Sequence, residues 1–390
     1  MSKLAPIGLT VYTRLDHTKR TIEALQKNTL AKESHLYIFS DAPKKGDEEN
    51  VSEMRRYLKT IGGFKKVIIT EREENSRINN NRLGQQFLLD KYGAMIWLAE
   101  DQITAPGFLK FTNDALVQYE KREDILCISL FTPNIDIQTD NDCFLMKRLC
   151  AWGIGIWKDR YEKLKYISKN DYELMMKQPK LLNRIKKYSG SDLLEWFKAE
   201  ANGSLDGLDT KGSFLTVTDS YYCVYPKKSL VFNTGHDGSG LHSGITNKYD
   251  TQLWDKDKGF YLPIDILEEK KISQKVASFY SDIQNNISES VLDQLCSKIK
   301  EAKVSSVTLW GTGDLAIHLS EELKKIDVEV NYFLNSWPQK NELFLNKKVI
   351  TPHEAVKKGE KNIVICSIAN RHKMLEEIKE FNINAYYYTN

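Results

Sequence analysis

The N-terminal part of the chain alternates short apolar runs with amphipathic stretches, and this alternation limits the possible folds more than any other feature. Apolar runs at residues 6–12, 35–40, 66–70 and 94–98 predict strands, and the stretches between them predict helices. Strands that alternate with helices at this spacing form a mostly parallel sheet with right-handed crossovers. We therefore expect an α/β fold whose first strands all end at one edge of a sheet.

Several of these predicted strands end in polar side chains. The first strand ends at Tyr12 and is followed by Arg14, Asp41 follows the second, and Glu100 and Asp101 follow the fourth. Ligands of open α/β sheets bind beside the carboxyl ends of the strands, so we expect these side chains to lie together. An acid pair in this place is typical of a site for a hard divalent cation that holds phosphate, and the alternative is a strand end with two solvated acids.

The composition excludes several classes of protein. The chain has 390 residues, of which 41% are hydrophobic and 28% charged, and its formal net charge is +3, which is too small to indicate binding to nucleic acid. The six cysteines show no metal-binding spacing, which indicates reduced thiols in a cytoplasmic protein. There is no signal-peptide pattern, and no apolar run approaches the roughly 18 residues of a membrane span, so we expect at most peripheral contact with the inner face of a membrane.

Two glycine-containing segments farther along the chain are candidate ligand contacts. Trp152 and Trp157 bracket two glycines, the first of which is Gly153. Such a segment can offer flat apolar faces to a sugar ring or a base, or it can be a core strand with packing glycines. The glycine-rich segment 233–242 ends in His242, and loops of this kind let backbone N–H groups face phosphate oxygens.

The composition changes toward the C-terminus, which predicts further domains after a first domain at residues 1–265. Residues 266–302 are charged and predict a helical connector. Residues 303–390 alternate strands and helices again and predict a small Rossmann-like α/β domain. Its glycine turn has Ala316 in place of the third glycine and Asn335 in place of the ribose-binding acid, so NAD is not expected. We expect this domain to bind another small molecule or to serve in packing.

Five motifs in the first two thirds of the chain occur in the order known from one enzyme family. They are Pro6-Ile-Gly-Leu-Thr-Val-Tyr-Thr-Arg14, Leu36-Tyr-Ile-Phe-Ser-Asp-Ala-Pro43, Ala99-Glu-Asp-Gln-Ile-Thr-Ala-Pro-Gly-Phe-Leu109, Cys150-Ala-Trp-Gly-Ile-Gly-Ile-Trp-Lys158 and Asn233-Thr-Gly-His-Asp-Gly-Ser-Gly-Leu-His242. With them the chain resembles bacterial family-2-like glycosyltransferases of the GT-A type, distantly similar to N-acetylglucosaminyltransferase I. The resemblance implies transfer of a hexosyl or N-acetylhexosaminyl group from a nucleotide sugar, with UDP as the expected nucleotide, to a glycan or lipid-linked glycan. Its expected setting is the synthesis of a bacterial surface polysaccharide such as capsule or lipopolysaccharide.

The resemblance also implies which residues bind the donor. A uracil-type base would lie near Tyr12 and be held through Arg14 and Asp41. Arg82 would lie near the diphosphate, unless it is only a surface arginine. The Trp152-Gly153 pair would line the donor site.

The family's metal motif has three acids, and here the first of them is replaced by Ala99. The resemblance therefore assigns the cation, Mn²⁺ or Mg²⁺, to Asp101, and leaves Glu100 to face the ribose or a metal-bound water. His242 would be a further metal ligand or a phosphate donor, and the alternative is a loop histidine bonded to backbone.

The family's catalytic base is less clearly matched. Spacing from the later Tyr225-Pro226 pair favours Asp209 as this carboxylate, and a match to the preceding serine would select Asp206 instead. With a positioned base and a metal-stabilised leaving group, the reaction would be a direct displacement with inversion. Two other functions stay open: a sugar nucleotidyltransferase, although no glycine-rich loop with a lysine follows the first strand, and a nucleotide- or glycan-binding module without activity.

Overall fold

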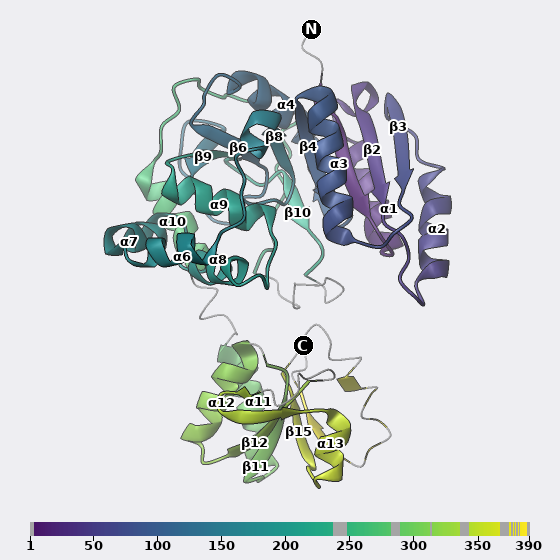
Figure 1. Ribbon diagram of the computed structural model, residues 1–390. Helices are drawn as coiled ribbons and strands as arrows, with labels where there is room; N and C mark the ends of the chain where they lie inside the picture. The colour runs from purple at the N-terminus through teal and green to yellow at the C-terminus, as the bar shows by residue number, and fades with distance from the viewer. Residues whose placement is uncertain are drawn as a thin grey trace. The chain divides into compact units, whose positions relative to one another are not determined.

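The computed structural model shows an α/β protein whose described residues form two compact units. It describes residues 4–236, 248–281, 289–312, 314–335 and 343–366, and some residues between 374 and 387. The first unit contains the described residues up to Thr234 and those from Lys248 to Ser281, and the second contains Gly235, His236 and the described residues from Glu289 onward. Each unit is built around a sheet of its own (Figure 1).

An eight-stranded sheet with the order β3-β2-β1-β4-β8-β6-β9-β7 forms the centre of the first unit. Its strands are β1 (Ile7–Val11), β2 (His35–Ser40), β3 (Lys66–Glu71), β4 (Ala94–Ala99), β6 (Ile125–Ser129), β7 (Cys143–Met146), β8 (Ile154–Trp157) and β9 (Tyr222–Pro226). The strands β3, β2, β1 and β4 are parallel, as predicted. However, β8 is antiparallel to both β4 and β6, and β7 is antiparallel to β9. The sheet is therefore mixed, with a majority of parallel pairings.

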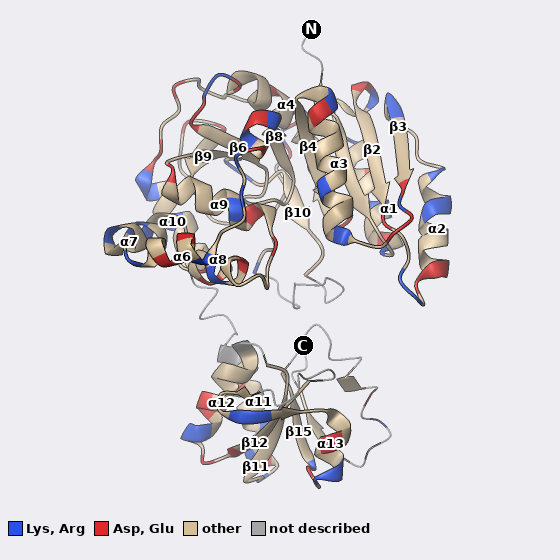
Figure 2. Cartoon of the chain, in the orientation of Figure 1, with Lys and Arg blue, Asp and Glu red and all other residues tan. Residues whose placement is uncertain are grey.

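Helices and connecting loops carry most of the charge of this unit, and the strands carry little (Figure 2). The helices are α1 (Leu15–Gln26), α2 (Glu48–Leu58), α3 (Arg77–Tyr92), α4 (Phe108–Gln118), α5 (Lys158–Tyr161), α6 (Lys169–Met176), α7 (Pro179–Tyr188), α8 (Leu193–Ala201), α9 (Leu208–Thr218) and α10 (Lys270–Ser281), with the short 3₁₀ helix η1 (Ala31–Glu33). The segment between Lys158 and Ala201 is divided into four of these helices. Ser168 caps α6 with a capping box, and Pro179 opens α7.

Two glycines let α3 pack closely against the sheet. A Cβ on Gly8 of β1 would lie 2.3 Å from the ring of Trp97 in β4, and a Cβ on Gly84 of α3 would lie 2.8 Å from the same ring. Phe39 of β2 stacks on this ring at 5.7 Å. Trp97 therefore fills the space between helix and sheet that the two glycines leave open.

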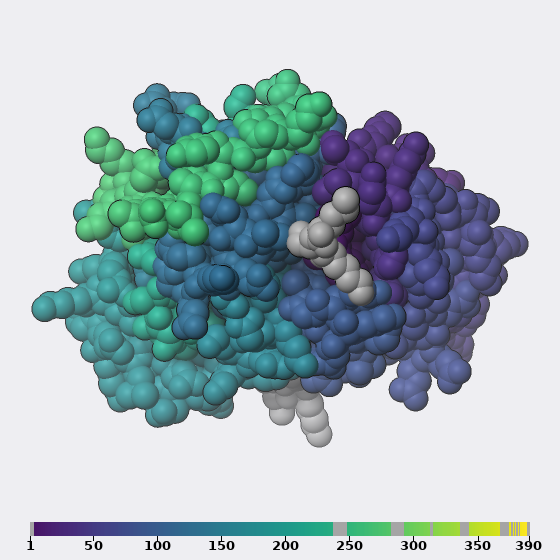
Figure 3. Space-filling model, turned by 90° about the horizontal axis from the view of Figure 1, so that it is seen from above, coloured from purple at the N-terminus to yellow at the C-terminus, as the bar shows by residue number. Residues whose placement is uncertain are grey.

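A two-stranded sheet continues from the end of β4. It pairs β5 (Gln102–Thr104) with β10 (Val231–Asn233) in antiparallel fashion. The segment after Lys248 then crosses the end of α4, where Gln118 Nε2 donates to the carbonyl of Leu262 at 2.8 Å. Figure 3 shows this green segment lying on the blue surface of the earlier chain. Distant parts of the sequence thus close into one unit.

The second unit has a six-stranded sheet with the order β13-β14-β12-β11-β15-β16, in which only the β13–β14 pairing is antiparallel among the described strands. Its elements are α11 (Glu289–Glu301), β11 (Ser306–Trp310), α12 (Asp314–Lys325), β12 (Glu329–Leu334), β13 (Leu343–Phe344), β14 (Lys347–Ile350), α13 (Pro352–Lys357), β15 (Asn362–Ile365) and β16 (Asn384–Tyr386). Ala316 lies in its core, and Gly311 makes the turn after β11 with a φ of 129°.

The helices of the expected connector lie in different units. Helix α10 packs against α7 in the first unit, and α11 packs against α12 in the second. Among the described residues, no helix is long and apolar enough to cross a membrane.

Candidate functional site

The polar side chains that follow β2, β1 and β4 lie at one edge of the first sheet. These three strands are neighbours and run parallel, so their carboxyl ends meet there, as predicted. The amide of Asp41 donates to the carbonyl of Val11 at 3.2 Å, which places the ends of β2 and β1 side by side. The edge therefore collects Tyr12, Arg14 and Asp41 beside the acid pair.

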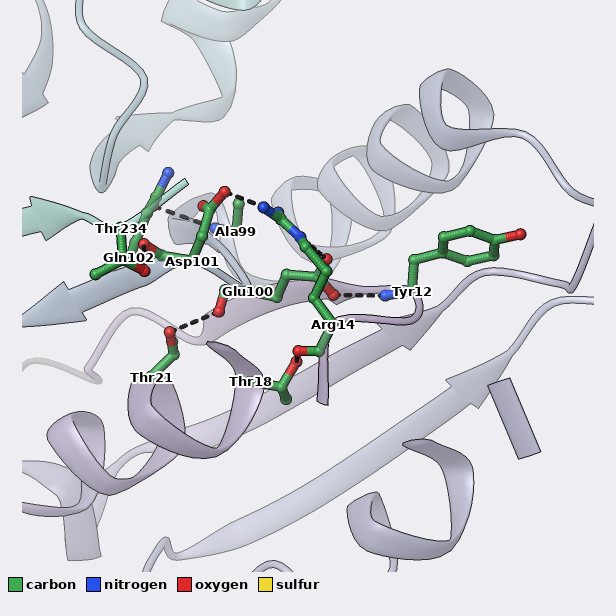
Figure 4. A network of polar contacts seen from close by, with 9 residues as sticks. All are labelled: Tyr12, Arg14, Thr18, Thr21, Ala99, Glu100, Asp101, Gln102 and Thr234. Carbon is green, nitrogen blue, oxygen red and sulfur yellow. Dashed lines mark hydrogen bonds and ion pairs between the residues drawn. The ribbon is translucent and has the colours of Figure 1, made fainter. Parts of the chain in front are cut away.

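Arg14 joins the two acids of the pair (Figure 4). Its Nε donates to Glu100 Oε1 at 2.7 Å, and its Nη2 donates to Asp101 Oδ2 at 2.7 Å. Charge-assisted hydrogen bonds of this kind are about twice as strong as neutral ones. The acids are thus held in one arrangement by a cation from the turn between β1 and α1, a contact that was not predicted.

Glu100 is the buried member of the pair. Its second oxygen, Oε2, accepts the backbone N–H of Tyr12 at 2.6 Å, and only 6% of the residue is exposed. Burial raises the pKa of Glu100, against the charge and hydrogen bond of Arg14 and the N–H of Tyr12, which lower it. We expected Glu100 to face a ribose or a metal-bound water, but the structure commits both of its oxygens to protein groups.

The backbone of the acid pair is held from two sides. Thr21 of α1 donates its hydroxyl to the carbonyl of Glu100 at 2.7 Å. Thr234, just after β10, donates its N–H to the carbonyl of Asp101 at 2.8 Å. The backbone of the acid pair is thus held independently of the contacts that Arg14 makes with the two side chains.

Asp101 is the carboxylate that suits a divalent cation. Its Oδ2 accepts from Arg14, whereas no hydrogen bond from the described residues reaches its Oδ1. Carboxylate oxygen suits Mg²⁺ and Mn²⁺, and Mg²⁺ commonly binds through one or two carboxylates together with phosphates and water. No cluster of three or more His, Cys, Asp or Glu side chains that could hold a metal occurs in the described parts of the chain. The ligand atoms present therefore fit a cation that would bind one oxygen of Asp101 and would take its other ligands from a diphosphate and water.

Gln102 connects the acid pair to the tryptophan–glycine segment. Its Oε1 accepts the N–H of Ala99 at 3.2 Å and that of Gly153 at 3.0 Å. Gly153 has a φ of 66°, and a Cβ there would lie 2.9 Å from the ring of Phe108. Glycine is thus required here for both backbone conformation and packing.

The two tryptophans of this segment have different environments. Trp157 is 5% exposed at the end of β8, and its indole N–H donates to the carbonyl of Leu116 at 3.2 Å. It belongs to the core, so the packing alternative holds for it. Trp152 is half-buried and lies edge-on to Phe131 and Tyr249, with ring centroids 4.7 and 5.1 Å apart. A platform formed by both tryptophans is therefore wrong, and only Trp152 remains a candidate contact.

The other residues that were expected to bind the nucleotide sugar lie in different environments. The hydroxyl of Tyr12 donates to Asp47 Oδ2 at 2.6 Å, and its ring points away from Asp101 (Figure 4). Asp41 Oδ1 accepts the backbone N–H groups of Ala42 and Ser76 at 3.0 and 3.1 Å. Arg82 is exposed on α3.

Arg82 forms no ion pair within the described residues. Its charge acts on Tyr161, whose pKa it lowers against the larger effect of burial. The structure thus does not bring Arg82 to the acid pair, and its expected contact with a diphosphate stays a prediction. His242 lies outside the described residues.

The candidate bases Asp206 and Asp209 flank the start of α9. Asp206 accepts from Lys211 Nζ and, at 3.0 Å, from the hydroxyl of Tyr166. Burial alone would raise the pKa of Asp206, but these hydrogen bonds and the charges of Lys211 and Arg77 hold it below its ordinary value. Asp206 is therefore ionised and committed to a cation.

Asp209 has the opposite character. Burial raises its pKa, and the backbone N–H groups at the start of α9 and the charges of Arg148 and Arg77 offset this only in part. Its own charge acts on Cys150, whose N–H donates to Ser129 at the carboxyl end of β6. Because β6 and β4 are both antiparallel to β8, this end belongs to the same edge as the acid pair. A perturbed carboxyl in such a place is a candidate general base.

Arg77 is a candidate site residue that the sequence did not single out. It is the first residue of α3, after the cap Ser76, and its charge acts on both Asp206 and Asp209. The sequence could have indicated a helix start with an arginine after Ser76. It could not have indicated that this arginine acts on two aspartates more than a hundred residues away in the chain.

Comparison with solved structures finds GT-A glycosyltransferases at low similarity. TarS 1–349 from S. aureus is 11% identical with a TM-score of 0.34, and the match covers 65% of this chain and 67% of that one. The mannosyltransferase PcManGT from Pyrobaculum calidifontis, in complex with GDP-Man and Mn²⁺, is 10% identical with a TM-score of 0.32, over 55% of this chain and 69% of that one. GalNAc-T7, with UDP, GalNAc and Mn²⁺, is 11% identical with a TM-score of 0.35, over 57% and 43%. No family model and no curated protein matches the chain. At these scores the similarity carries no argument about function.

Proposed function

We propose that the first unit is a glycosyltransferase of the GT-A type that moves a sugar from a nucleotide sugar, with UDP as the nucleotide, to an acceptor hydroxyl. The observation that carries this proposal is the sheet edge itself. An acid pair with one unoccupied carboxylate oxygen on Asp101 shares that edge with a second carboxyl, Asp209, whose pKa is raised by burial. The first can anchor a diphosphate, and the second can accept a proton.

The donor half of the reaction needs a stable leaving group. A Mn²⁺ or Mg²⁺ ion on Asp101 would offset the negative charge that develops on the departing nucleoside diphosphate. Arg14 holds the Asp101 side chain in place for this, and Thr234 holds its backbone. Tyr12 and Asp41, at the ends of the two neighbouring strands, are the proposed contacts of the base.

The acceptor half needs a base that is ionised but not already neutralised. Asp206 is paired with Lys211 and is a weak base for that reason. Asp209 has no ion-pair partner among the described residues, and its raised pKa makes it the stronger base. We assign it the removal of the proton from the acceptor hydroxyl, whose oxygen then attacks the anomeric carbon directly, so that the product has the inverted configuration.

The wider setting follows from the motif resemblance alone. We place the enzyme in the cytoplasm, in the synthesis of a bacterial surface glycan, with a glycan or lipid-linked glycan as acceptor. The second unit would bind a small molecule or serve in packing. A binding module without activity is the alternative, and the replacement of an acid by Ala99 is the observation that favours it.

The donor site is tested by thermal unfolding with UDP and Mn²⁺. The melting temperature of the wild-type protein should rise with both ligands together, and Asp101→Ala should abolish the rise. Asp219→Ala, an exposed acid at the end of α9, is the matched control and should keep it. If Asp101→Ala keeps the full rise, the acid pair is not the donor site.

A further inference from the structure

We propose that Arg14 reserves Asp101 for a nucleotide-bound cation: without nucleotide it offsets half of the charge of the acid pair and occupies one Asp101 oxygen, so that a divalent cation binds there strongly only together with a diphosphate. This inference rests on the proposed function. It assigns Arg14 a role as a positioning residue at the metal site, in addition to any contact with a base.

The guanidinium of Arg14 pairs with both acids at once. Arg14 reaches Glu100 with Nε and Asp101 with Nη2, both at 2.7 Å, so one cation serves two acids (Figure 4). The three side chains together carry a net charge of −1 when both acids are ionised. Without Arg14 the acids alone would carry −2 and would be the stronger site for a free cation.

Few carboxylate oxygens of the acid pair are open to a cation. Both oxygens of Glu100 and one oxygen of Asp101 accept hydrogen bonds, which leaves Asp101 Oδ1 as the single open oxygen among those of the pair. A hard cation in water gains little from exchanging one water for one carboxylate oxygen beside a fixed positive charge. The free acid pair is therefore a weak cation site.

The third guanidinium nitrogen of Arg14 can favour a bound diphosphate. Nη1 is buried and has no hydrogen-bond partner among the described residues. A buried donor without an acceptor is costly, so an anionic oxygen beside it would be favoured. A diphosphate supplies such oxygens and also supplies the ligands that a cation on Asp101 lacks. The cation and the diphosphate therefore bind better together than either binds alone.

The test measures two affinities that this role moves in opposite directions. Mn²⁺ binding without nucleotide is followed by electron paramagnetic resonance, and UDP binding at saturating Mn²⁺ by calorimetry. Arg14→Gln should bind Mn²⁺ alone about tenfold more tightly, because the variant removes the repulsion between a unit positive charge and a divalent cation at about 5 Å in a water-like medium. The same variant should bind UDP at least about tenfold more weakly, the loss of one hydrogen bond to a charged group. A merely structural role would weaken both.

Two control variants separate charge from geometry. Arg14→Lys keeps the positive charge and should leave Mn²⁺ binding as weak as in the wild type. Arg20→Gln removes an exposed arginine of α1 and should change neither affinity.

Removing Arg14 leaves Glu100 buried without its cation and can cost folding stability. The double variant Arg14→Gln/Glu100→Gln removes the buried pair together and keeps Asp101 with both oxygens open. It should bind Mn²⁺ alone at least as tightly as the wild type and bind UDP more weakly.

The proposal is overturned if Arg14→Gln binds Mn²⁺ no more tightly than the wild type, or if its UDP affinity is unchanged. It is also overturned if the wild-type protein binds Mn²⁺ tightly without nucleotide, a result that leaves the proposed function standing. A protein that binds no nucleotide at all defeats the proposed function, whereas the Mn²⁺ measurement without nucleotide still reports on Arg14.

Discussion

Arg148 and Asp192 form a buried ion pair in the first unit. The guanidinium donates two hydrogen bonds to the carboxylate, at 2.8 and 2.7 Å, and the side chains are 1% and 5% exposed. The ring of Tyr280 lies 3.6 Å from the guanidinium, so the pair also touches α10. The ion pair joins the loop after β7 to the start of α8, and the contact with Tyr280 adds α10.

We predict that Arg148→Ala lowers the free energy of unfolding of the first unit by about 3–5 kcal/mol, because it leaves Asp192 as an uncompensated buried charge. Chemical denaturation of the full chain measures this loss. Lys110→Ala, which breaks the more exposed pair with Asp114 on α4, should cost at most about 1 kcal/mol. Equal losses in the two variants would show that burial does not determine the effect.

The pH dependence of turnover should report the raised pKa of Asp209. A general base must be ionised, so kcat falls as the pH falls through its pKa. Since burial raises the pKa of Asp209, the acidic limb should lie above the value of about 3.9 for an exposed aspartate. An acidic limb at or below that value would exclude Asp209 as the base.

The two aspartates at the start of α9 should have opposite effects on stability at pH 7. The folded-state pKa of Asp209 is raised, so its ionised form costs folding free energy above that pKa, and Asp209→Asn should raise the melting temperature. The folded-state pKa of Asp206 is lowered, so its ionised form stabilises the fold above the unfolded pKa and less as the pH falls. Asp206→Asn should therefore lower the melting temperature. A lower melting temperature for Asp209→Asn would contradict this assignment of the two environments.

Gly153 connects the fold to the site, and we predict that Gly153→Ala harms both. The positive φ and the contact of a Cβ with Phe108 should cost about 1–3 kcal/mol, and the shift of the backbone should disturb Gln102 beside Asp101. Gly62→Ala is the control, because a Cβ there meets nothing within 4 Å. Denaturation and UDP binding measure the two effects. Unchanged UDP binding in a folded Gly153→Ala protein would show that the segment does not position the acid pair.

The parallel half of the sheet was predictable from the sequence because short apolar runs alternate there with stretches that predict helices. The direction of β8 was not predictable, since an apolar run has the same pattern in either direction. The insertion of β8 between β4 and β6 nevertheless determines where Gly153 lies. Residues far apart in the chain meet through this pairing.

The members of the site were more predictable than their partners. The acid pair is visible as two carboxylates at the end of an apolar run, and Arg14 as a polar residue at the end of another. Their ion pair depends on side-chain directions across two neighbouring strands, which periodicity does not specify. Spacing left Asp206 and Asp209 as alternatives, and they differ only through Lys211, Tyr166 and the burial around them.

The proposed transfer reaction is tested most directly by nucleotide release. The wild-type protein and Asp209→Asn are incubated with UDP-, GDP-, dTDP- and CMP-sugars in the presence of Mn²⁺, and the free nucleotide is measured. We predict release from one class of donor, expected to be UDP-sugars, by the wild-type protein, and a loss of about 100-fold or more in Asp209→Asn with nucleotide affinity retained. A wild-type protein that binds nucleotide but releases none from any donor would contradict the proposal and leave a binding module in its place.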